Sequence, residues 1–407
     1  MTAAVPRTSS GALELLADRT FRQVWLAGAL LGIQRWLELL AIGIYVFDRT
    51  GSPFQVALMT MLRILPMALL SAFAGALADR VSRRLLLQIS IVGMTAVSGG
   101  LGLLALTGAI ELWHIALGAL LGGVFWATDL PVRRTLLGEI AGSDRLGAGM
   151  GLDAATNNAT RMLGPVLGGF LLQLIGLDGS FFVGAALFAV SFLLLARVDF
   201  AETHAVGIGR NVLRNILEGL QYLRTDRALV GTLAVTVIFN IWGFPFTSMV
   251  PVIGRDIMNL EAGAVGLLMS AEGAGALIGA LAIAFRARQA HYRRIYFYGT
   301  FAFLALVLVF GATGLPAVSA TVLLAIGVAG ACFSSMQSTI TLLSAPPAIR
   351  GRIMGVVSVC IGTGVLGFLY IGLLADWLGA PLAVMLTAAQ GLVAMVLVGL
   401  IWPELRR

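Results

Sequence analysis

The chain of 407 residues is 59% apolar and only 12% charged, and it carries a formal net charge of +7. Its mean hydropathy of +0.95 is far above that of soluble globular proteins. This composition excludes a soluble enzyme, a disordered chain and a nucleic-acid-binding protein, because the basic residues fall in short clusters between long apolar runs. All 27 basic residues are arginines, and an arginine does not release its proton in a protein.

Apolar runs long enough to cross a membrane recur along the whole chain. A bilayer core of about 30 Å requires about 20 apolar residues in helical form, and continuous apolar runs exclude the alternating pattern of barrel strands. We therefore predict an all-α integral membrane protein. Its twelve transmembrane helices are expected at 24–47, 54–78, 85–107, 112–128, 149–176, 180–196, 228–250, 263–285, 295–313, 316–341, 353–375 and 381–402.

Arginines cluster in every second connection between these runs, beginning with the N-terminal segment and ending with the C-terminus. The intervening connections hold only Arg49 and Arg255. Because positively charged connections stay on the cytoplasmic side of a membrane, the pattern predicts that both termini are cytoplasmic and that the number of spans is even. We expect a multi-pass protein of the cell inner membrane, in contact with the lipid bilayer.

The longest polar stretch, 199–227, divides the chain into two sets of six spans. Its apolar residues recur at helical spacing, which predicts a cytoplasmic linker with an amphipathic helix between an N-terminal bundle, 1–198, and a C-terminal bundle, 228–407. The tetrapeptide that begins at Gly75 in the second span recurs at Gly279 in the eighth, 204 residues later. Two parallel six-helix repeats favour a transporter over a channel or a membrane-bound enzyme.

A glycine, an aspartate and three arginines follow the second span at fixed spacing. The segment resembles the signature of the major facilitator superfamily, with Ser82 where a glycine is usual. Such a glycine lets two helices approach closely, and the aspartate can pair with the positive start of a helix in the other half, for which the eleventh span after Arg350 is a candidate. An incidental aspartate in a positive loop is the alternative. The expected cytoplasmic gating motif comprises Gly75, Asp79, Arg80, Arg83 and Arg84.

The fifth span carries a stripe of small residues. It resembles the antiporter motif of the same superfamily, with Thr160 where a glycine is usual, and this resemblance implies export in exchange for protons. Glycines at spacings of four allow close helix packing, and a proline can introduce a bend; close packing without any role in coupling is the alternative. The motif comprises Gly151, Thr160, Gly164, Pro165, Gly168 and Gly169.

The resemblance extends over nearly the whole chain. Phe21-Arg-Gln-Val-Trp25, Arg63-Ile-Leu-Pro66 and Ile349-Arg-Gly-Arg352 resemble segments of the branch that contains enterobactin exporters and macrolide-efflux proteins. This resemblance implies the major facilitator fold, with two six-helix bundles, and export of hydrophobic or amphipathic organic molecules.

Charged residues inside the spans are expensive, and each is therefore a candidate functional group. Only a carboxylate or a histidine can carry a coupling proton here, and the three histidines lie away from the centres of the spans. Glu38 is favoured because it lies near the centre of the first span, although it could also be a permanently ionised partner of an arginine. The proton-coupling candidates are Glu38, Asp153, Glu272 and Asp129, the last at the cytoplasmic end of the fourth span. Their expected charge partners are Arg35, Arg63 and Arg161.

Aromatic and amide side chains in several spans suggest a cavity for amphipathic organic molecules, although ordinary helix packing explains any one of them equally well. The substrate-cavity candidates are Trp36, Trp126, Asn240, Trp242, Phe333 and Gln337.

The sequence therefore predicts a monomeric secondary transporter that exports a drug-like or siderophore-like compound by proton antiport and alternating access. A proton-independent facilitator or flippase for an anionic amphiphile is the alternative, which the intramembrane arginines would suit. A membrane sensor or scaffold that moves nothing is a further alternative. No phosphate-binding loop, metal-ligand cluster or nucleophile with its base is evident, so we expect no cofactor, no metal and no enzymatic activity.

Overall fold

The computed structural model describes residues 8–78, 83–198, 226–345 and 349–406, and this part of the chain is almost entirely helical. The N-terminal half contains α1 (Thr8–Ala17), α2 (Arg19–Thr50), α3 (Pro53–Ala78), α4 (Arg83–Leu106) and α5 (Leu112–Ala196). The long elements of the C-terminal half are α7 (Arg227–Ile238), α9 (Ala262–Arg286), α10 (Tyr292–Ala312), α11 (Pro316–Ser344), α12 (Arg350–Gly362), α13 (Gly364–Leu378) and α14 (Ala380–Ile401). Its short elements are η1 (Phe239–Gly243), η2 (Phe244–Ser248), α8 (Met249–Val252), η3 (Ile253–Ile257), η4 (Gln289–His291) and η6 (Pro403–Leu405).

The continuous element α5 contains three membrane spans. Gly142 and Gly176 interrupt it with φ values of 71° and 73°, a left-handed conformation that glycine adopts without a steric penalty. Ten helices of the described part are long and apolar enough to cross a membrane, and the 53-residue segment Asp144–Ala196 among them is divided at Gly176. With that division and with α3, the structure has the twelve spans expected from the sequence, in the expected order.

The fourth and fifth spans are longer than predicted. The helix that begins at Leu112 continues to Gly142 rather than ending at 128, and the next begins at Asp144 rather than 149. Asp129, predicted at the cytoplasmic end of the fourth span, therefore lies inside the helix rather than at its end. The extension is explained by charge pairing, since Arg133 and Arg134 on the added turns both bind Asp153 of the fifth span, and Arg133 is buried there.

The seventh and eleventh spans are irregular rather than single α-helices. The seventh passes from α7 through a π-turn, η1, into the 3-10 turn η2, where Pro245 lacks a backbone donor. The eleventh is divided at Thr363 into α12 and α13. The irregular turns of the seventh span bring Phe239 and Asn240 toward the centre of the molecule, where both line a cavity.

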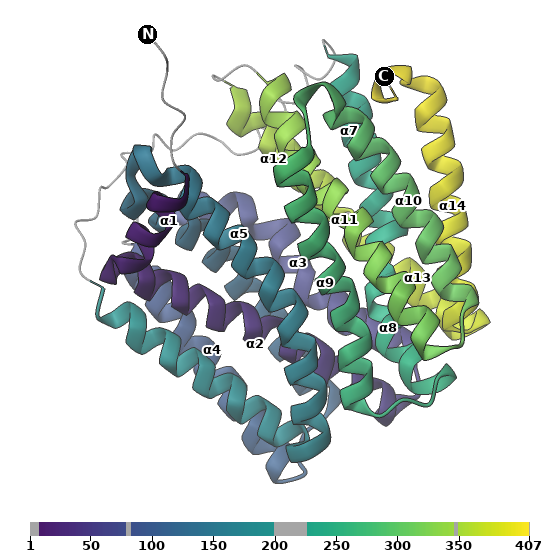
Figure 1. Ribbon diagram of the computed structural model, residues 1–407. Helices are drawn as coiled ribbons and strands as arrows, with labels where there is room; N and C mark the ends of the chain where they lie inside the picture. The colour runs from purple at the N-terminus through teal and green to yellow at the C-terminus, as the bar shows by residue number, and fades with distance from the viewer. Residues whose placement is uncertain (1–7, 79–82, 199–225, 346–348, 407) are drawn as a thin grey trace.

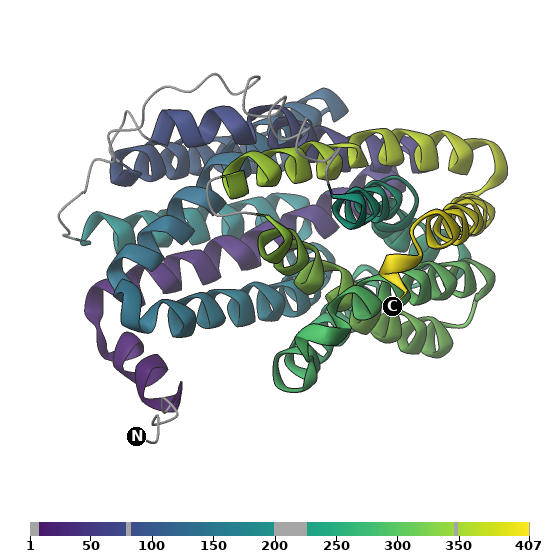
Figure 2. The ribbon, with the colours of Figure 1, turned by 90° about the horizontal axis from the view of Figure 1, so that it is seen from above.

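The helices form two bundles that lie side by side (Figure 2). The last described element, η6, lies at the face of the molecule that is uppermost in Figure 1, and α1 lies lower, at the left of the picture. We call this face the terminal face and the opposite one the far face. In Figure 1, α2 and α4 run obliquely whereas α9, α10 and α14 run steeply, so the two halves diverge toward the terminal face.

Small residues make the contact between the halves very close. The fifth span, within α5, packs along α9, and a Cβ atom on Gly266 would lie only 2.5 Å from the carbonyl oxygen of Pro165. A Cβ atom on Gly273 would lie 2.7 Å from the carbonyl oxygen of Arg161. The second pair of packed spans is α3 with α13, where Gly372 approaches Phe54. Backbone contact of this kind requires glycine, because any side chain would push the halves apart.

Candidate functional site

A cavity of about 210 Å³ lies between the two halves. Residues of the second, fourth and fifth spans line it on one side, and the seventh to eleventh spans supply the other. Four of the six predicted cavity residues line it, namely Trp126, Asn240, Phe333 and Gln337.

The other two predicted cavity residues, Trp36 and Trp242, are not among the described lining residues. The ring of Trp36 lies under the guanidinium of Arg161, with the Cζ atom 5.4 Å from the ring centroid. The indole of Trp242 donates a hydrogen bond to Gln390 of α14, at 3.1 Å. We correct the prediction for both, because the irregular turns of the seventh span direct Trp242 toward α14 and close packing of α2 on Gly164 holds Trp36 at the fifth span.

Aromatic rings form the wall of the cavity that belongs to the C-terminal half. Phe239 stacks on Phe333 with ring centroids 3.6 Å apart and planes 10° apart. Phe303 packs against Phe239 at 4.7 Å in a tilted orientation. All three side chains are largely buried, and their faces offer a planar apolar surface to a bound molecule.

The amide side chains of the same wall are held by a hydroxyl network. Asn240 donates a hydrogen bond from Nδ2 to the backbone carbonyl of Thr236, at 2.9 Å. Gln337 donates from Nε2 to the Thr236 hydroxyl, at 3.1 Å. That hydroxyl also contacts the hydroxyl of Tyr296 at 2.9 Å, and both hydroxyls lie against the carbonyl of Thr232. Thr236 is therefore the common anchor of both amides.

An ion pair crosses from one half to the other at the cavity. Arg161 of the fifth span donates from Nη2 to Oε1 of Glu272 on α9, at 2.5 Å. Glu272 is buried, and the adjacent Gly273 packs directly on the backbone of Arg161. The predicted charge partner and the predicted carboxylate thus contact each other, and the pair ties the halves together beside the cavity.

A second polar network lies inside the N-terminal bundle. Glu38 accepts hydrogen bonds at Oε2 from Gln34, at 2.8 Å, and from Arg63, at 3.2 Å. Arg35, on the same helix, does not bind Glu38 but lies over the ring of Trp126, with its Cζ atom 4.5 Å from the centroid. All three charged side chains are buried. One arginine and one amide therefore already bind Glu38 at Oε2.

Two further carboxylates of this bundle share one arginine. Asp153 accepts hydrogen bonds from Arg133, at 2.8 Å, and from Arg134, at 2.9 Å. Asp129 is 1% exposed and lies 3.5 Å from Arg133 Nε, one helical turn away. Neither oxygen of Asp129 has a hydrogen-bond partner in the described part of the chain. Asp129 is thus the least engaged of the four predicted proton-coupling candidates.

A small polar cavity of about 10 Å³ lies beside Asp129, with room for about one water molecule. Gln34, Arg35 and Arg63 also line it. Trp126 lines both this small cavity and the central cavity. One aromatic side chain therefore separates a buried carboxylate that lacks a hydrogen bond within the described residues from the space between the halves.

The predicted antiporter motif lies in the fifth span and contacts both neighbours of that span. Gly164 and Gly168 pack on Trp36 and Leu37 of α2, and Gly169 packs on the backbone of α9. Thr160, at the position where a glycine is usual, donates to the backbone carbonyl of Asn157 and is buried. Around Gly151 there is open space instead.

The predicted gating motif falls only partly within the described residues. Asp79 and Arg80 lie outside them. The backbone of Gly75 is helical in α3, and Arg83 and Arg84 begin α4. The linker helix predicted within 199–227 also lies almost wholly outside the described residues.

Polar contacts at the far face join the halves, and sequence reasoning did not find them. Arg255 donates to both carboxylate oxygens of Asp48, at 2.9 and 3.0 Å. Asp376, at the end of α13, accepts hydrogen bonds from the Ser52 hydroxyl and from the backbone N–H of Phe54, both at 3.0 Å, so it caps the first turn of α3. A signal was available, because Arg255 is one of only two arginines in the far connections.

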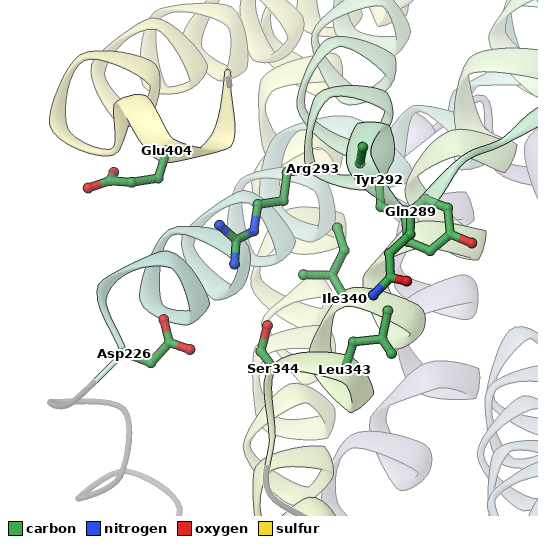
Figure 3. A pocket seen from close by; sticks show the side chains of 9 residues that line it. Asp226, Gln289, Tyr292, Arg293, Ile340, Leu343, Ser344 and Glu404 are labelled. Carbon is green, nitrogen blue, oxygen red and sulfur yellow. The ribbon is translucent and has the colours of Figure 1, made fainter.

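A further pocket, of about 570 Å³, lies within the C-terminal half at its terminal face (Figure 3). Arg293 reaches into it, and Asp226 and Glu404 line it as well. Ile340 and Leu343 of α11 form its apolar side. This pocket lies wholly within one half, so relative motion of the halves would leave it intact, unlike the central cavity.

Comparison with known sequences identifies the protein family to which the chain belongs. The family model described as "Transmembrane secretion effector" matches residues 10–405. The uncharacterized MFS-type transporter YfiS of Bacillus subtilis (strain 168) is 26% identical, over 97% of this chain and 93% of its own length. The multidrug efflux pump Tap of Mycolicibacterium fortuitum is 26% identical over 92% of this chain and 93% of its own. The Staphyloferrin A transporter of Staphylococcus aureus is 22% identical over 62% and 64%.

Solved structures confirm the fold. A variant of the nucleoside transporter NupG superimposes with a TM-score of 0.77 at 14% identity, and the match covers 95% of this chain and all of that one. A bacterial homologue of the iron transporter ferroportin, in an inward-facing state, gives a TM-score of 0.70 at 15% identity over 97% of this chain and 99% of its own. The predicted fold, two six-helix bundles of the major facilitator type, is therefore confirmed. The chain belongs to the transmembrane secretion effector family of the major facilitator superfamily, and it is a multi-pass membrane transporter rather than an enzyme.

Proposed function

We propose that this protein exports a hydrophobic or amphipathic organic compound from the cytoplasm in exchange for protons, by alternating exposure of the central cavity. The observation that carries this proposal is the aromatic cavity between the two halves, lined by Phe239, Phe333 and Trp126 with a few amide groups. Relatives named as multidrug and macrolide efflux proteins support a substrate of this class.

The contacts between the halves support alternating access. The ion pair of Asp48 with Arg255 and the cap that Asp376 gives to α3 hold the far face together, whereas the halves diverge toward the terminal face (Figure 1). The arginine distribution supports a cytoplasmic location of the terminal face. We propose that the described arrangement is cytoplasm-facing, that the bundles 1–198 and 228–407 rock about the contact of α5 with α9 at Gly273, and that one chain suffices for transport.

Among the carboxylates, Asp129 is the best site for the exchanged proton. Protonation of Glu38, Asp153 or Glu272 would disrupt a hydrogen bond that an arginine already donates to the carboxylate. Protonation of Asp129 disrupts no hydrogen bond in the described part of the chain and weakens only the 3.5 Å ion pair with Arg133. A buried carboxylate without hydrogen bonds loses least when it becomes neutral. Glu38, favoured on the sequence, becomes the second candidate.

Trp126 provides the link between proton and substrate. Its ring lies under Arg35, which faces Asp129 across the small cavity, and the same ring forms part of the wall of the central cavity. A bound compound that displaces Trp126 also displaces Arg35. The positive charge near Asp129 then changes, and the affinity of Asp129 for a proton changes with it.

The test uses the whole protein in liposomes with a preformed pH gradient. Lipophilic drugs and siderophore-like compounds are added one at a time, and dissipation of the gradient is compared for the parent protein, Asp129→Asn and Glu38→Gln. We expect dissipation in the parent and its loss in Asp129→Asn, with substrate binding retained. Because both substitutions replace a carboxylate with an amide of equal size, Glu38→Gln is the matched control.

Each other result has a definite meaning. Loss of proton movement in Glu38→Gln but not in Asp129→Asn would transfer the proton site to Glu38. Substrate flux in the parent without proton movement would replace the antiporter with a facilitator or flippase. If no compound crosses the membrane under any gradient, a sensor or scaffold takes the place of the exporter.

A further inference from the structure

We propose that the central cavity selects aromatic compounds that carry a hydrogen-bond donor, such as an aryl amine, amide N–H or hydroxyl, and that the carbonyl oxygens of Asn240 and Gln337 are the acceptors. This inference rests on the proposed function, because it takes the cavity as the transport site. To the proposed function it adds the hydrogen-bonding character of the substrate and the residues that recognise this character.

The orientation of Asn240 follows from its partner. The amide contacts the backbone carbonyl of Thr236, which can only accept a hydrogen bond, so the group that faces it must be the Nδ2 amine. The Oδ1 oxygen then points away from Thr236 and lies 3.7 Å from the position of a Cβ atom on Gly364, a lining residue of the cavity. Asn240 is therefore held with its acceptor toward the cavity.

The orientation of Gln337 follows from a count of hydroxyl protons. The hydroxyls of Thr236 and Tyr296 have two protons between them, of which one binds the backbone carbonyl of Thr232 and the other joins the two hydroxyls. Neither proton remains for Gln337, so the Thr236 hydroxyl accepts from Gln337, which presents its Nε2 amine. The Oε1 oxygen of Gln337 is left for the cavity, which Gln337 also lines.

These two oxygens are the unpaired acceptors of an otherwise apolar wall. In the described part of the chain no donor reaches either of them, whereas the lining Ser334 donates to its own helix and Arg161 is paired with Glu272. Asn240 and Gln337 are each 6% exposed. A compound that stacks on Phe239 and Phe333 without a donor displaces water from these oxygens and leaves them unpaired, which costs binding free energy.

The size of the preference follows from the same argument. One hydrogen bond contributes about 0.5–1.5 kcal/mol net, and leaving an acceptor unsatisfied costs at least as much. We expect a donor-bearing compound to bind about tenfold more tightly than its counterpart in which a methyl group replaces the hydrogen.

Thr236 is a positioning residue for this selection, because it touches neither cavity nor compound but fixes both amides. Replacement by valine keeps the shape and removes the hydroxyl, so Gln337 is free to rotate and present its amine to the cavity. The preference for a donor should then decrease. Thr236→Ser retains the hydroxyl and should retain the preference.

The experiment measures binding of two fluorescent probes to the full chain in lipid nanodiscs, with signal from empty nanodiscs subtracted. The probes are N-phenyl-1-naphthylamine, which has one N–H donor, and its N-methyl derivative, which has none. We expect about tenfold tighter binding of the donor probe to the parent and to Thr236→Ser. In Thr236→Val the ratio falls to about one third of that value or lower, and Asn240→Leu lowers it independently while the methyl probe still binds.

Equal affinity of the parent for the two probes, with both slowing substrate export, would overturn donor selection and leave the proposed function in place. If neither probe binds and neither slows export, the cavity is not the aromatic site, and the inference and its basis fail together. A preference unchanged in both Thr236→Val and Asn240→Leu, each with parental thermal stability, would also overturn the assignment of these acceptors.

Discussion

Gly266 offers a direct test of the contact that keeps the far face closed. In Gly266→Ala the new Cβ atom would lie 2.5 Å from the carbonyl oxygen of Pro165, where ordinary contacts begin near 3.4 Å. The partner is backbone, which cannot rotate away, so α9 and the fifth span must separate locally by about 0.9 Å.

The energetic cost of this separation falls on one conformation only. Inserting a methyl group into a closely packed contact costs about 1–3 kcal/mol. The cost applies while the far face is closed and disappears when it opens, because the two helices then part near Gly266. The equilibrium between the two conformations should therefore shift toward the open far face by about 5- to 150-fold.

Distances between paired spin labels measure this shift in a background without Cys332 and Cys360. Labels at the exposed Thr107 and Leu315 report on the far face, one in each half, and labels at Glu14 and Arg288 report on the terminal face. We expect the far-face distance to lengthen and the terminal-face distance to shorten.

The control for Gly266→Ala is Gly93→Ala, because a Cβ atom on Gly93 meets nothing within 4 Å. Distance distributions in Gly266→Ala that match those of the parent and the control would refute the argument. Lengthening at both faces would refute it as well, because that result means loosened bundles rather than alternation.

Two further predictions concern the N-terminal bundle. Asp153→Asn leaves the buried Arg133 without its closest carboxylate, so we expect a loss of about 3 kcal/mol in the free energy of unfolding. The midpoint temperature of thermal unfolding in detergent should decrease clearly in this variant. It should hardly change in the control Glu261→Gln, because Glu261 is exposed. Trp126→Phe should reduce the protons moved per substrate while substrate still binds, because the ring that separates the two cavities shrinks. Phe244→Leu, which alters only the central cavity, should weaken binding and leave that ratio unchanged, and equal ratios in all three proteins would contradict the role of Trp126.

The sequence predicted the number and order of the spans because hydrophobic length alone determines them. It misplaced the ends of the fourth and fifth spans because their added turns are charged. Arg133 and Arg134 are typical of a cytoplasmic loop, and the tertiary contact of both with Asp153 favours the helix and compensates for the burial of Arg133. A pattern along one helix cannot show that its neutralising partner lies on another.

Only some of the cavity residues were predicted, because contacts between helices also determine which side chains line the cavity. Asn240, Phe333 and Gln337 were identified by residue type, but Thr236 and Tyr296, which orient the two amides, carry no such signal in the sequence. Trp242 was assigned to the cavity because it is an aromatic residue of the seventh span. The π-turn of the seventh span changes the rotation of the helix at that residue, and such a turn has no reliable sequence pattern.

The pair of Arg161 with Glu272 bears on the choice between a proton antiporter and a flippase for an anionic amphiphile. An anion at the cavity would compete with Glu272 for Arg161. Protonation of Glu272 would release Arg161 and so favour the anion, which makes proton and anion bind together. Exchange requires the opposite, because each ligand must weaken the binding of the other.

A donor-bearing compound at Asn240 and Gln337 avoids this conflict. It leaves the ion pair of Arg161 with Glu272 intact and acts on Asp129 only through Trp126, the side chain that separates the central cavity from the small cavity beside Asp129. If the substrate proves to be an anion, the same geometry requires Arg161 and Glu272 to separate, and protons should then accelerate its binding rather than oppose it. The sign of the proton effect on substrate affinity therefore distinguishes the two transporters even before the substrate is known.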